Sequence, residues 1–244
     1  MNYTFTYDNA RLKKDYQLWW ENSITSARNV TSLLYAALSK DFHEKNKKLL
    51  GTPFAQFLKL TSEVRTLFKV GEKQHIAARF MGGVLWSYGN QTIAPYSEQF
   101  YIGGANSLRA FTVRSIGPGT YNPGQNTKYG YLDQTGDIKL EANVEYRFPI
   151  FGELYGATFL DAGNVWLMRK DENRPGGEFT LKNFVKSIAL NTGVGVRYDL
   201  TFLVIRLDMG IALHVPYETG KSGYYNIPKF KDGLGLHFAI GYPF

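Results

Sequence analysis

Long stretches of strict alternation between apolar and polar side chains constrain the fold of this chain more than any other feature. The clearest stretch, 139–148 (KLEANVEYRF), places every apolar residue on one face and every polar or charged residue on the other. The same alternation returns in 188–199, 202–212 and 234–244. A two-residue period is typical of a β-strand whose two faces meet different surroundings. The sequence therefore predicts a protein built from strands.

The predicted strands are long. We predict nine of them, at about 2–8, 15–28, 54–70, 74–89, 137–149, 154–168, 188–199, 202–213 and 233–244. Many run about 11 to 15 residues, whereas strands in globular proteins average about 5 to 6 residues. A tilted strand crosses a bilayer with about 9 to 11 residues. The strand lengths therefore favour a sheet that spans a membrane.

The connections between these strands alternate in length. Short ones fall near 8–14, 71–73, 151–153 and 200–201, and long ones cover about 29–53, 90–136, 169–187 and 214–232. Short turns on one side and long loops on the other are typical of bacterial outer-membrane barrels, whereas a soluble antiparallel sheet has no reason to alternate so regularly. We therefore predict an all-β fold, an antiparallel transmembrane β-barrel of about nine strands. The segment 31–40 predicts a short helix inside the first long loop.

The composition agrees with this fold class and excludes several others. Aromatic residues make up 16% of the chain and glycines number 25, which favours strands and turns. The mean hydropathy is −0.27 and no apolar run approaches the ~20 residues of a spanning helix, so a helical membrane span is excluded. The absence of cysteine excludes disulfides, thiolate metal sites and cysteine nucleophiles. The net charge of +7 is spread over loop-like stretches, which favours solvated loops over a nucleic-acid surface.

Charged side chains decide which face of each strand points inward. Facing hydrocarbon costs a Lys or Arg roughly 2 to 4 kcal/mol at the bilayer midplane. The strands from 137 onward carry eight charged residues on a single face. We expect these eight to face a wet or internally paired lumen: Lys139, Glu141, Glu145, Arg147, Asp161, Arg197, Arg206 and Asp208. On the opposite parity, aromatic residues near strand ends predict the girdles of the membrane interfaces: Tyr146, Phe148, Trp166, Tyr198, Tyr242 and Phe244.

The long segment beginning at Phe100, FYIGGANSLRAFTVRSIGPGTY, resembles the surface loop of the Omp85 superfamily barrel, also called the bacterial surface antigen domain. The matching positions are Gly103, Gly104, Leu108, Arg109, Ala110 and Phe111, followed by Ile116, Gly117 and Pro118. Ala110 stands where the family usually has glycine, so we expect less close backbone packing there. Two further matches follow in order, EANVEYRFPIFGELYGATFLDAGNVW (141–166) and LHFAIGYPF (236–244). The spacing is similar to that of the BamA-like and TamA-like branches.

The resemblance implies a specific site. In the family this loop folds back into the lumen, and its arginine pairs with acidic residues on the two strands that follow. Carried over, Arg109 pairs with Glu145 and Asp161, with Phe111 beside it and Gly103, Gly104 and Gly117 shaping the loop. The strand pattern agrees, because Glu145 and Asp161 fall on the inward parity of consecutive strands. An arginine between two carboxylates would form a geometrically fixed latch.

The last strand also resembles a family feature. Its outward face ends in Phe238, Ile240, Tyr242 and Phe244, with Gly241 between, which is similar to the β-signal of outer-membrane proteins. The resemblance implies that this strand closes the barrel at a weak seam, which opens and templates a client strand by edge pairing. We expect it to pair with 202–213.

The resemblance covers only the C-terminal part of a 16-strand family barrel. We therefore expect 1–244 to be one partial transmembrane barrel domain, with the long LRAF-bearing loop at about 90–136 and a terminal strand at 233–244, and without the first strands and the POTRA domains. No export signal is visible at the N-terminus, so we expect an upstream part to be missing.

No catalytic motif is found in the sequence. It contains no phosphate-binding loop and no nucleophile elbow, and its four histidines lie far apart. We therefore expect no enzyme activity, no cofactor and no metal. The main hypothesis is an insertase barrel of the bacterial outer membrane, acting through a lateral seam on unfolded outer-membrane proteins, with membrane lipids and assembly-machinery subunits as further partners and no nucleic acid. The alternatives are a passive pore or two-partner secretion transporter, and the membrane anchor of a missing N-terminal enzyme domain.

Overall fold

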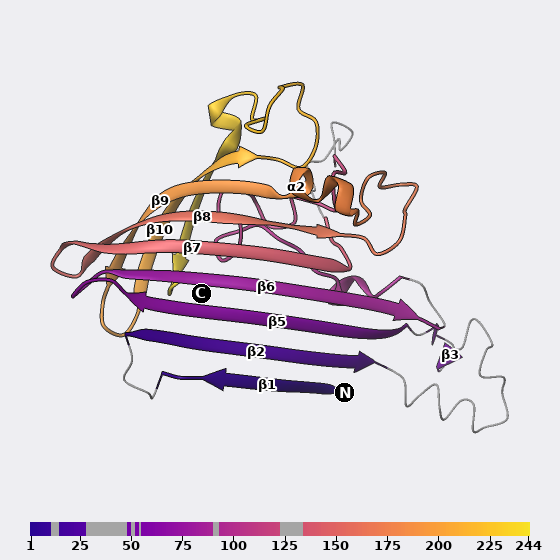
Figure 1. Cartoon of the computed structure of the whole chain (residues 1–244), viewed down its shortest axis with the longest axis horizontal. Helices are drawn as coiled ribbons and strands as arrows, with labels where there is room; N and C mark the ends of the chain where they lie inside the picture. The colour runs from indigo at the N-terminus through magenta and orange to yellow at the C-terminus, as the bar shows by residue number, and fades with distance from the viewer. Residues whose placement is uncertain (11–14, 28–47, 50–51, 54, 90–92, 123–133) are drawn as a thin grey trace.

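A computed structural model describes residues 1–10, 15–27, 48–49, 52–53, 55–89, 93–122 and 134–244. Nine antiparallel strands form one sheet in the order β1-β2-β5-β6-β7-β8-β9-β10-β11 (Figure 1). Each strand is therefore paired with the strands of this sheet that precede and follow it in the chain. Their bounds are β1 Asn2–Asp8, β2 Tyr16–Ala27, β5 Gln56–Lys69, β6 His75–Tyr88, β7 Ile138–Phe151, β8 Leu154–Trp166, β9 Ala189–Asp199, β10 Val204–His214 and β11 Leu234–Ile240.

The remaining elements are short. Strands β3 (Lys48–Leu49) and β4 (Thr52–Pro53) form a small separate hairpin, which the sequence did not predict. The helical turns are η1 (Tyr96–Glu98), η2 (Leu181–Asn183), α2 (Phe184–Ser187) and η3 (Phe230–Gly233). Among the described residues no helix is long and apolar enough to cross a membrane. The helix predicted at 31–40 lies outside the described residues.

The predicted fold class and strands are confirmed. Eight of the nine strands begin and end within two residues of their predicted bounds. The exception is the last strand, which ends at Ile240 rather than at Phe244. Within the described residues the sheet does not close, since β1 and β11 each pair with a single neighbour.

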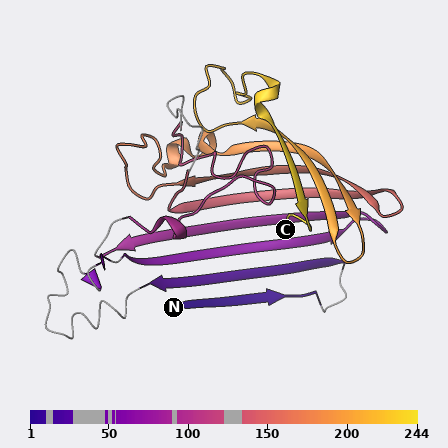
Figure 2. The same cartoon turned by 180° about the vertical axis from the view of Figure 1, so that it is seen from behind.

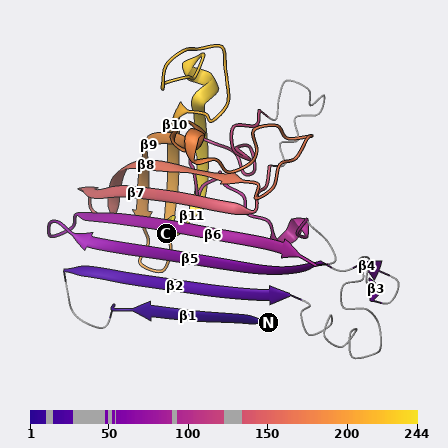
Figure 3. The same cartoon turned by 45° about the vertical axis from the view of Figure 1, so that its right-hand side comes forward.

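The sheet is curved, and its curvature creates an inside. Strands β1 to β6 lie nearly side by side, whereas β9 to β11 turn steeply away from them and curl over one face, most clearly in Figure 3. Seen from behind, the segment 93–122 lies against that concave face, between β6–β8 and the curled strands (Figure 2). Strands β2, β6, β8 and β10, which precede the four long connections in the sequence, end on one side of the sheet, and β1, β5, β7 and β9 end on the other.

The predicted faces of the strands from β7 onward are confirmed for the charged residues. All eight charged side chains lie on the inner face, and each takes part in an ion pair. The outer face carries exposed apolar side chains at the centre of the strands, such as Leu160, Val194 and Leu207. This separation agrees with a sheet that meets hydrocarbon on one side, because unpaired charge is costly there.

The assignment of Tyr242 and Phe244 to the outer girdle is wrong. Gly241 has φ +86°, and its N–H makes the last bond of the ladder, to the Val204 carbonyl over 2.7 Å. Glycine adopts this left-handed conformation without the steric cost of a side chain. The chain turns inward after it, so that the Tyr242 ring lies 4.1 Å from the Arg147 guanidinium on the inner face of β7.

Apolar residues of the inserted segment supply much of the buried core. Phe100, Ile102, Leu108, Phe111 and Ile116 are buried there. They pack with inward residues of the strands, including Phe57, Leu85, Val165 and Ala212. The chain's own loop therefore packs against the concave face from β5 to β10, and this face in turn holds the loop.

Candidate functional site

The inserted segment is pinned at the point where it enters and leaves the sheet. Phe100 and Gly136 exchange two backbone hydrogen bonds, each of 2.9 Å. Beside them the Asp137 carboxylate accepts a bond from the Met168 backbone N–H over 3.1 Å, and burial raises the pKa of this carboxyl above its ordinary value. The two ends of the loop are thus closed against each other, so the loop has few ways to swing out as a whole.

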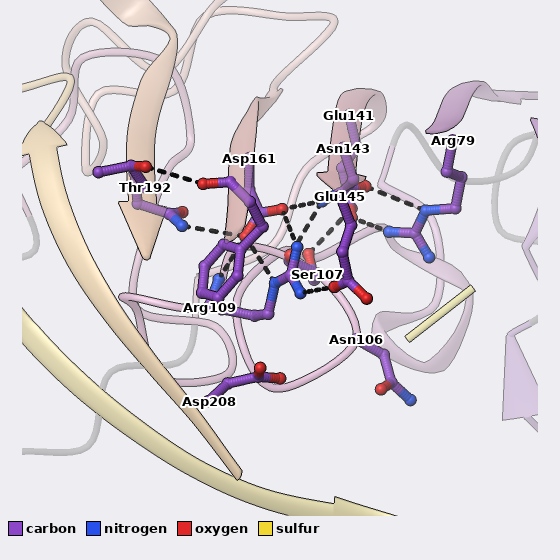
Figure 4. Close-up of polar contacts among 12 residues, drawn as sticks. Arg79, Asn106, Ser107, Arg109, Glu141, Asn143, Glu145, Asp161, Thr192 and Asp208 are labelled. Carbon is purple, nitrogen blue, oxygen red and sulfur yellow. Dashed lines mark hydrogen bonds and ion pairs between the residues drawn. The ribbon is translucent and has the colours of Figure 1, made fainter. Parts of the chain in front are cut away.

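Arg109, at the tip of the inserted segment, lies against two carboxylates of the inner wall (Figure 4). Its Nε donates to Asp161 Oδ2 over 3.0 Å and its Nη2 to Asp161 Oδ1 over 2.8 Å, while Nη1 donates to Glu145. The guanidinium carbon lies 3.5 Å from the centre of the Phe159 ring. All three ionised side chains are fully buried. The structure therefore brings together the three residues that the sequence singled out.

Glu145 is shared among three arginines. Besides Arg109, it accepts from Arg147 Nε over 2.7 Å and from Arg197 Nη2 over 3.0 Å. Arg197 in turn contacts Asp208 of β10 over 2.6 Å. A buried carboxylate with several charge-assisted bonds is firmly held, so Glu145 links the loop to both β7 and β9.

Among the residues that the structure describes, Asp161 has one cationic partner, Arg109. Its other bonds come from neutral amides, Asn143 Nδ2 and Asn191 Nδ2, each over 2.9 Å. The Arg109 backbone N–H adds a further bond of 3.2 Å. The charge of Asp161 is thus balanced by the loop alone, which makes this carboxylate the one most dependent on the loop's position.

A second contact fixes the loop on β7. Ser107 Oγ donates to Glu141 Oε2 over 2.9 Å, and the Ser107 carbonyl accepts from Asn143 Nδ2 over 3.0 Å. Glu141 is also paired with Arg79 of β6 and with Lys139. Neither Glu141 nor Ser107 was predicted as part of this site, although Glu141 was predicted to lie on the inward face of its strand.

The predicted loop glycines adopt conformations that other residues rarely take. Gly103, Gly104 and Gly117 have φ of +95°, +93° and +90°. A Cβ on Gly103 would lie 2.2 Å from the Thr112 carbonyl oxygen, so the loop folds tightly on itself there. Phe111 is buried in the core cluster, and its carbonyl accepts from the Gly104 N–H over 2.8 Å. These residues shape the loop that presents Arg109.

The expectation of looser backbone packing at Ala110 is wrong. The backbone of Arg109 and Ala110 lies directly on β10 and β11, where a Cβ on Gly210 would be 2.4 Å from the Arg109 carbonyl oxygen and one on Gly235 2.8 Å from it. Gly210 and Gly235 are register partners. The loop backbone approaches the sheet closely because these two positions of β10 and β11 are glycines. Neither glycine was predicted to have this role. Gly193 and Gly195 instead make room for Phe159 and for the Asp208–Arg197 pair.

The C-terminal residues of the chain lie inside the curl. Phe238 and Ile240 are on the outer face of β11, both about two-thirds exposed at 69%. Beyond Gly241, the Phe244 ring is 5.5 Å from the Arg79 guanidinium, and Tyr242 rests on Arg147. The predicted terminal signal is thus divided, with two apolar residues outside and two aromatic residues inside.

Gly241→Val is expected to expel this tail from the lumen, because a β-branched residue does not tolerate φ +86°. A cysteine at position 244, probed with a membrane-impermeant maleimide in detergent-solubilised protein, should then be labelled faster than in the Gly241 parent. Gly220→Val is the matched control, since Gly220 also has φ +80° and no atom near its Cβ position. Equal labelling in parent and Gly241→Val would contradict this role of Gly241.

Within the described ranges no group of three or more His, Asp or Glu side chains is placed to hold a metal ion. The polar centre is instead a network of ion pairs between a loop and a wall. Such a network fixes the position of the loop against the wall.

Comparison with known proteins agrees with this architecture. The Omp85 superfamily domain matches residues 38–244. The outer membrane protein assembly factor BamA of Neisseria meningitidis is 33% identical over 90 residues, which cover 34% of this chain and 11% of that protein. The human sorting and assembly machinery component 50 homolog is 29% identical over 150 residues, covering 59% of this chain and 30% of that protein.

A solved structure shares the fold. The crystal structure of BamA from Haemophilus ducreyi lacking POTRA domains 1–3 superposes with a TM-score of 0.51 and 14% identity, covering 98% of this chain and 53% of that one. The matches to the two curated relatives span less than a third of each. The chain belongs to the Omp85 superfamily and forms part of a β-barrel of the bacterial outer membrane.

Proposed function

We propose that this chain is the C-terminal part of a non-enzymatic insertase barrel, which assembles outer-membrane proteins by pairing their strands with the edge of β11. Residues 1–244 would then be one partial barrel domain. The single observation that carries this proposal is that β11, among the described residues, pairs with β10 alone and lies beside a loop fixed by buried ion pairs. The names of the two curated relatives, an assembly factor and an assembly-machinery component, support the same function.

The edge of β11 suits strand pairing. Within the described residues β11 pairs only with β10, from Ile205↔Ile240 to Ile211↔Leu234. An unpaired edge offers backbone N–H and C=O groups to another extended segment. The outward side chains Leu236, Phe238 and Ile240 are apolar and exposed, so an incoming strand would meet lipid-compatible neighbours on the same face.

The loop supports the edge from inside. Because Arg109 and Ala110 rest on Gly235 of β11, the latch to Glu145 and Asp161 holds the terminal strand in its curled position. We infer that the latch keeps the edge aligned while its outer side stays available. The filled interior favours this mechanism over a wide passive pore, since buried side chains of the loop occupy the concave face.

The proposal is tested with the full-length protein reconstituted in liposomes. An unfolded outer-membrane barrel added as client should fold into these liposomes faster than into protein-free ones, as measured by protection from protease. Electrical recordings on the same preparation address the alternative function. Stable ion conductance without any acceleration of client folding would favour the passive-pore or secretion-transporter alternative and contradict the proposal.

A further inference from the structure

An apolar groove of about 650 Å³ lies on the outer face of the sheet, in the half nearer the long connections. Outward side chains of four neighbouring strands form its bed, and aromatic residues of β8 and the β8–β9 connection form one wall. The apolar lining consists of Ile24, Leu60, Val84, Ile138, Leu140, Trp166, Phe179 and Phe184. The ion pairs of Arg79, Lys139 and Glu141 lie on the opposite face of the same strands.

The depth of the groove comes from Ser62 and Gly82, two small residues in register. Asn22, Ser62, Gly82 and Leu140 are successive partners across β2, β5, β6 and β7. A Cβ on Gly82 would meet only the Leu140 side chain, at 3.9 Å, so the floor of the groove is open space. The next residue, Gly83, faces inward, where a Cβ would lie 2.5 Å from the Phe100 ring. At Gly82 and Gly83, therefore, little more than the backbone of β6 lies between the groove and the loop.

The aromatic wall is already held in place. The ring centroids of Trp166, Phe179 and Phe184 are 5.6 to 5.9 Å apart. Trp166 Nε1 donates to Ser187 Oγ over 3.0 Å, and that hydroxyl donates to the Phe184 carbonyl over 2.7 Å. A wall whose rotamers are fixed in advance loses little entropy when it binds a flexible chain.

Basic residues flank Phe184, a residue of this wall, in the sequence. In the turn η2–α2, the side chain of Leu181 is 83% exposed and that of Val185 is 67% exposed. An exposed lysine directly follows each of them, Lys182 after Leu181 and Lys186 after Val185. Exposed apolar residues alternating with lysines at the end of a membrane-spanning sheet are typical of the membrane interface, where the lysine stems lie along apolar surface and the charges reach phosphate groups.

We propose that the groove binds one acyl chain of an anionic lipid in the leaflet at the long-connection end, with Lys182 and Lys186 at the level of its phosphate groups. The apolar lining selects a hydrocarbon chain, and the two lysines select a phosphate-bearing lipid over a zwitterionic one. The proposal is independent of the insertase function, because it concerns the outer face and no client protein.

The test uses the full-length protein in detergent with two lipids offered separately, purified lipid A and phosphatidylcholine, and native mass spectrometry to count retained lipids. The parent protein should retain one lipid A molecule. Gly82→Leu fills the floor of the groove and should lose that molecule, while Ala78→Leu, which places the same side chain on the same face of β6 outside the groove, should keep it. Gel mobility before and after heating verifies that both variants are folded.

The charge contribution is tested by Lys182→Gln with Lys186→Gln. Each lysine near an anionic lipid surface is worth roughly a fivefold change in affinity, so this pair should lower lipid A retention on the order of tenfold or more. Lys229→Gln with Lys231→Gln removes the same charge from exposed positions of another long connection and should change little. Full lipid A retention by Gly82→Leu, or equal losses in the two lysine pairs, would overturn the proposal.

Discussion

Arg109→Met is expected to release the loop and to lower the stability of the folded sheet by about 3 to 5 kcal/mol, the cost of leaving a buried charge without its partner. Glu145 keeps Arg147 and Arg197 in this variant, whereas Asp161 loses the guanidinium and keeps neutral donors, such as the amides of Asn143 and Asn191. The loss should appear as a lower temperature for the change in gel mobility between folded and heat-unfolded protein.

Two further variants separate the latch from general effects of removing an arginine. Arg174→Met breaks an ion pair with Asp171 that is about a quarter exposed, so it should change the transition temperature little. Adding Asp161→Asn to Arg109→Met removes the orphaned charge and should recover part of the loss. A transition temperature unchanged by Arg109→Met would show that these buried ion pairs do not hold the loop.

Gly210→Val is expected to displace the loop tip even though Arg109 itself is intact. The new Cβ would be 2.4 Å from the Arg109 carbonyl oxygen and 2.6 Å from the Ala110 nitrogen, and these are backbone atoms that cannot rotate aside. Overpacking of this kind typically costs about 1 to 3 kcal/mol. The displaced loop should become a substrate for trypsin at Arg109 or Arg114 in the folded protein, as measured by mass spectrometry of the fragments.

Gly82→Val provides the control for this substitution, because it makes the same change in β6 where the nearest atom is 3.9 Å away. It should leave the loop as resistant to trypsin as in the parent. Equal resistance in Gly210→Val would mean that the loop does not depend on the close approach to β10.

The sequence was sufficient to predict most of the sheet, for a physical reason. A strand between lipid and a polar interior must alternate, and charges such as Glu141 and Arg206 cannot face hydrocarbon, so parity alone assigned both faces. The contact of Arg109 with Glu145 and Asp161 needed more than parity. It was predicted because a family resemblance supplied the inward fold of the loop.

The features that were missed depend on backbone conformation or on distant contacts. Alternation continues through Tyr242 and Phe244, and nothing in the pattern reveals that Gly241 has a positive φ and turns the chain inward. Trp166 was predicted to face an interface, yet it is almost fully buried because Phe179 and Phe184 from the next connection cover it. Gly210 and Gly235 were overlooked because a strand glycine gives no local sign of what lies against it.

Crosslinking the edge of β11 tests the proposed insertase function most directly. In the full-length protein, a cysteine at Phe238 would be crosslinked to a cysteine on the strand that faces β11, and client insertion would be measured before and after reduction. A second pair at Met209 and Leu236, register partners on β10 and β11, serves as the control, because these strands stay paired in any mechanism. We expect the seam crosslink to abolish client insertion reversibly and the control crosslink to leave insertion unchanged. Undiminished insertion through a completely crosslinked seam would contradict the proposed insertase function.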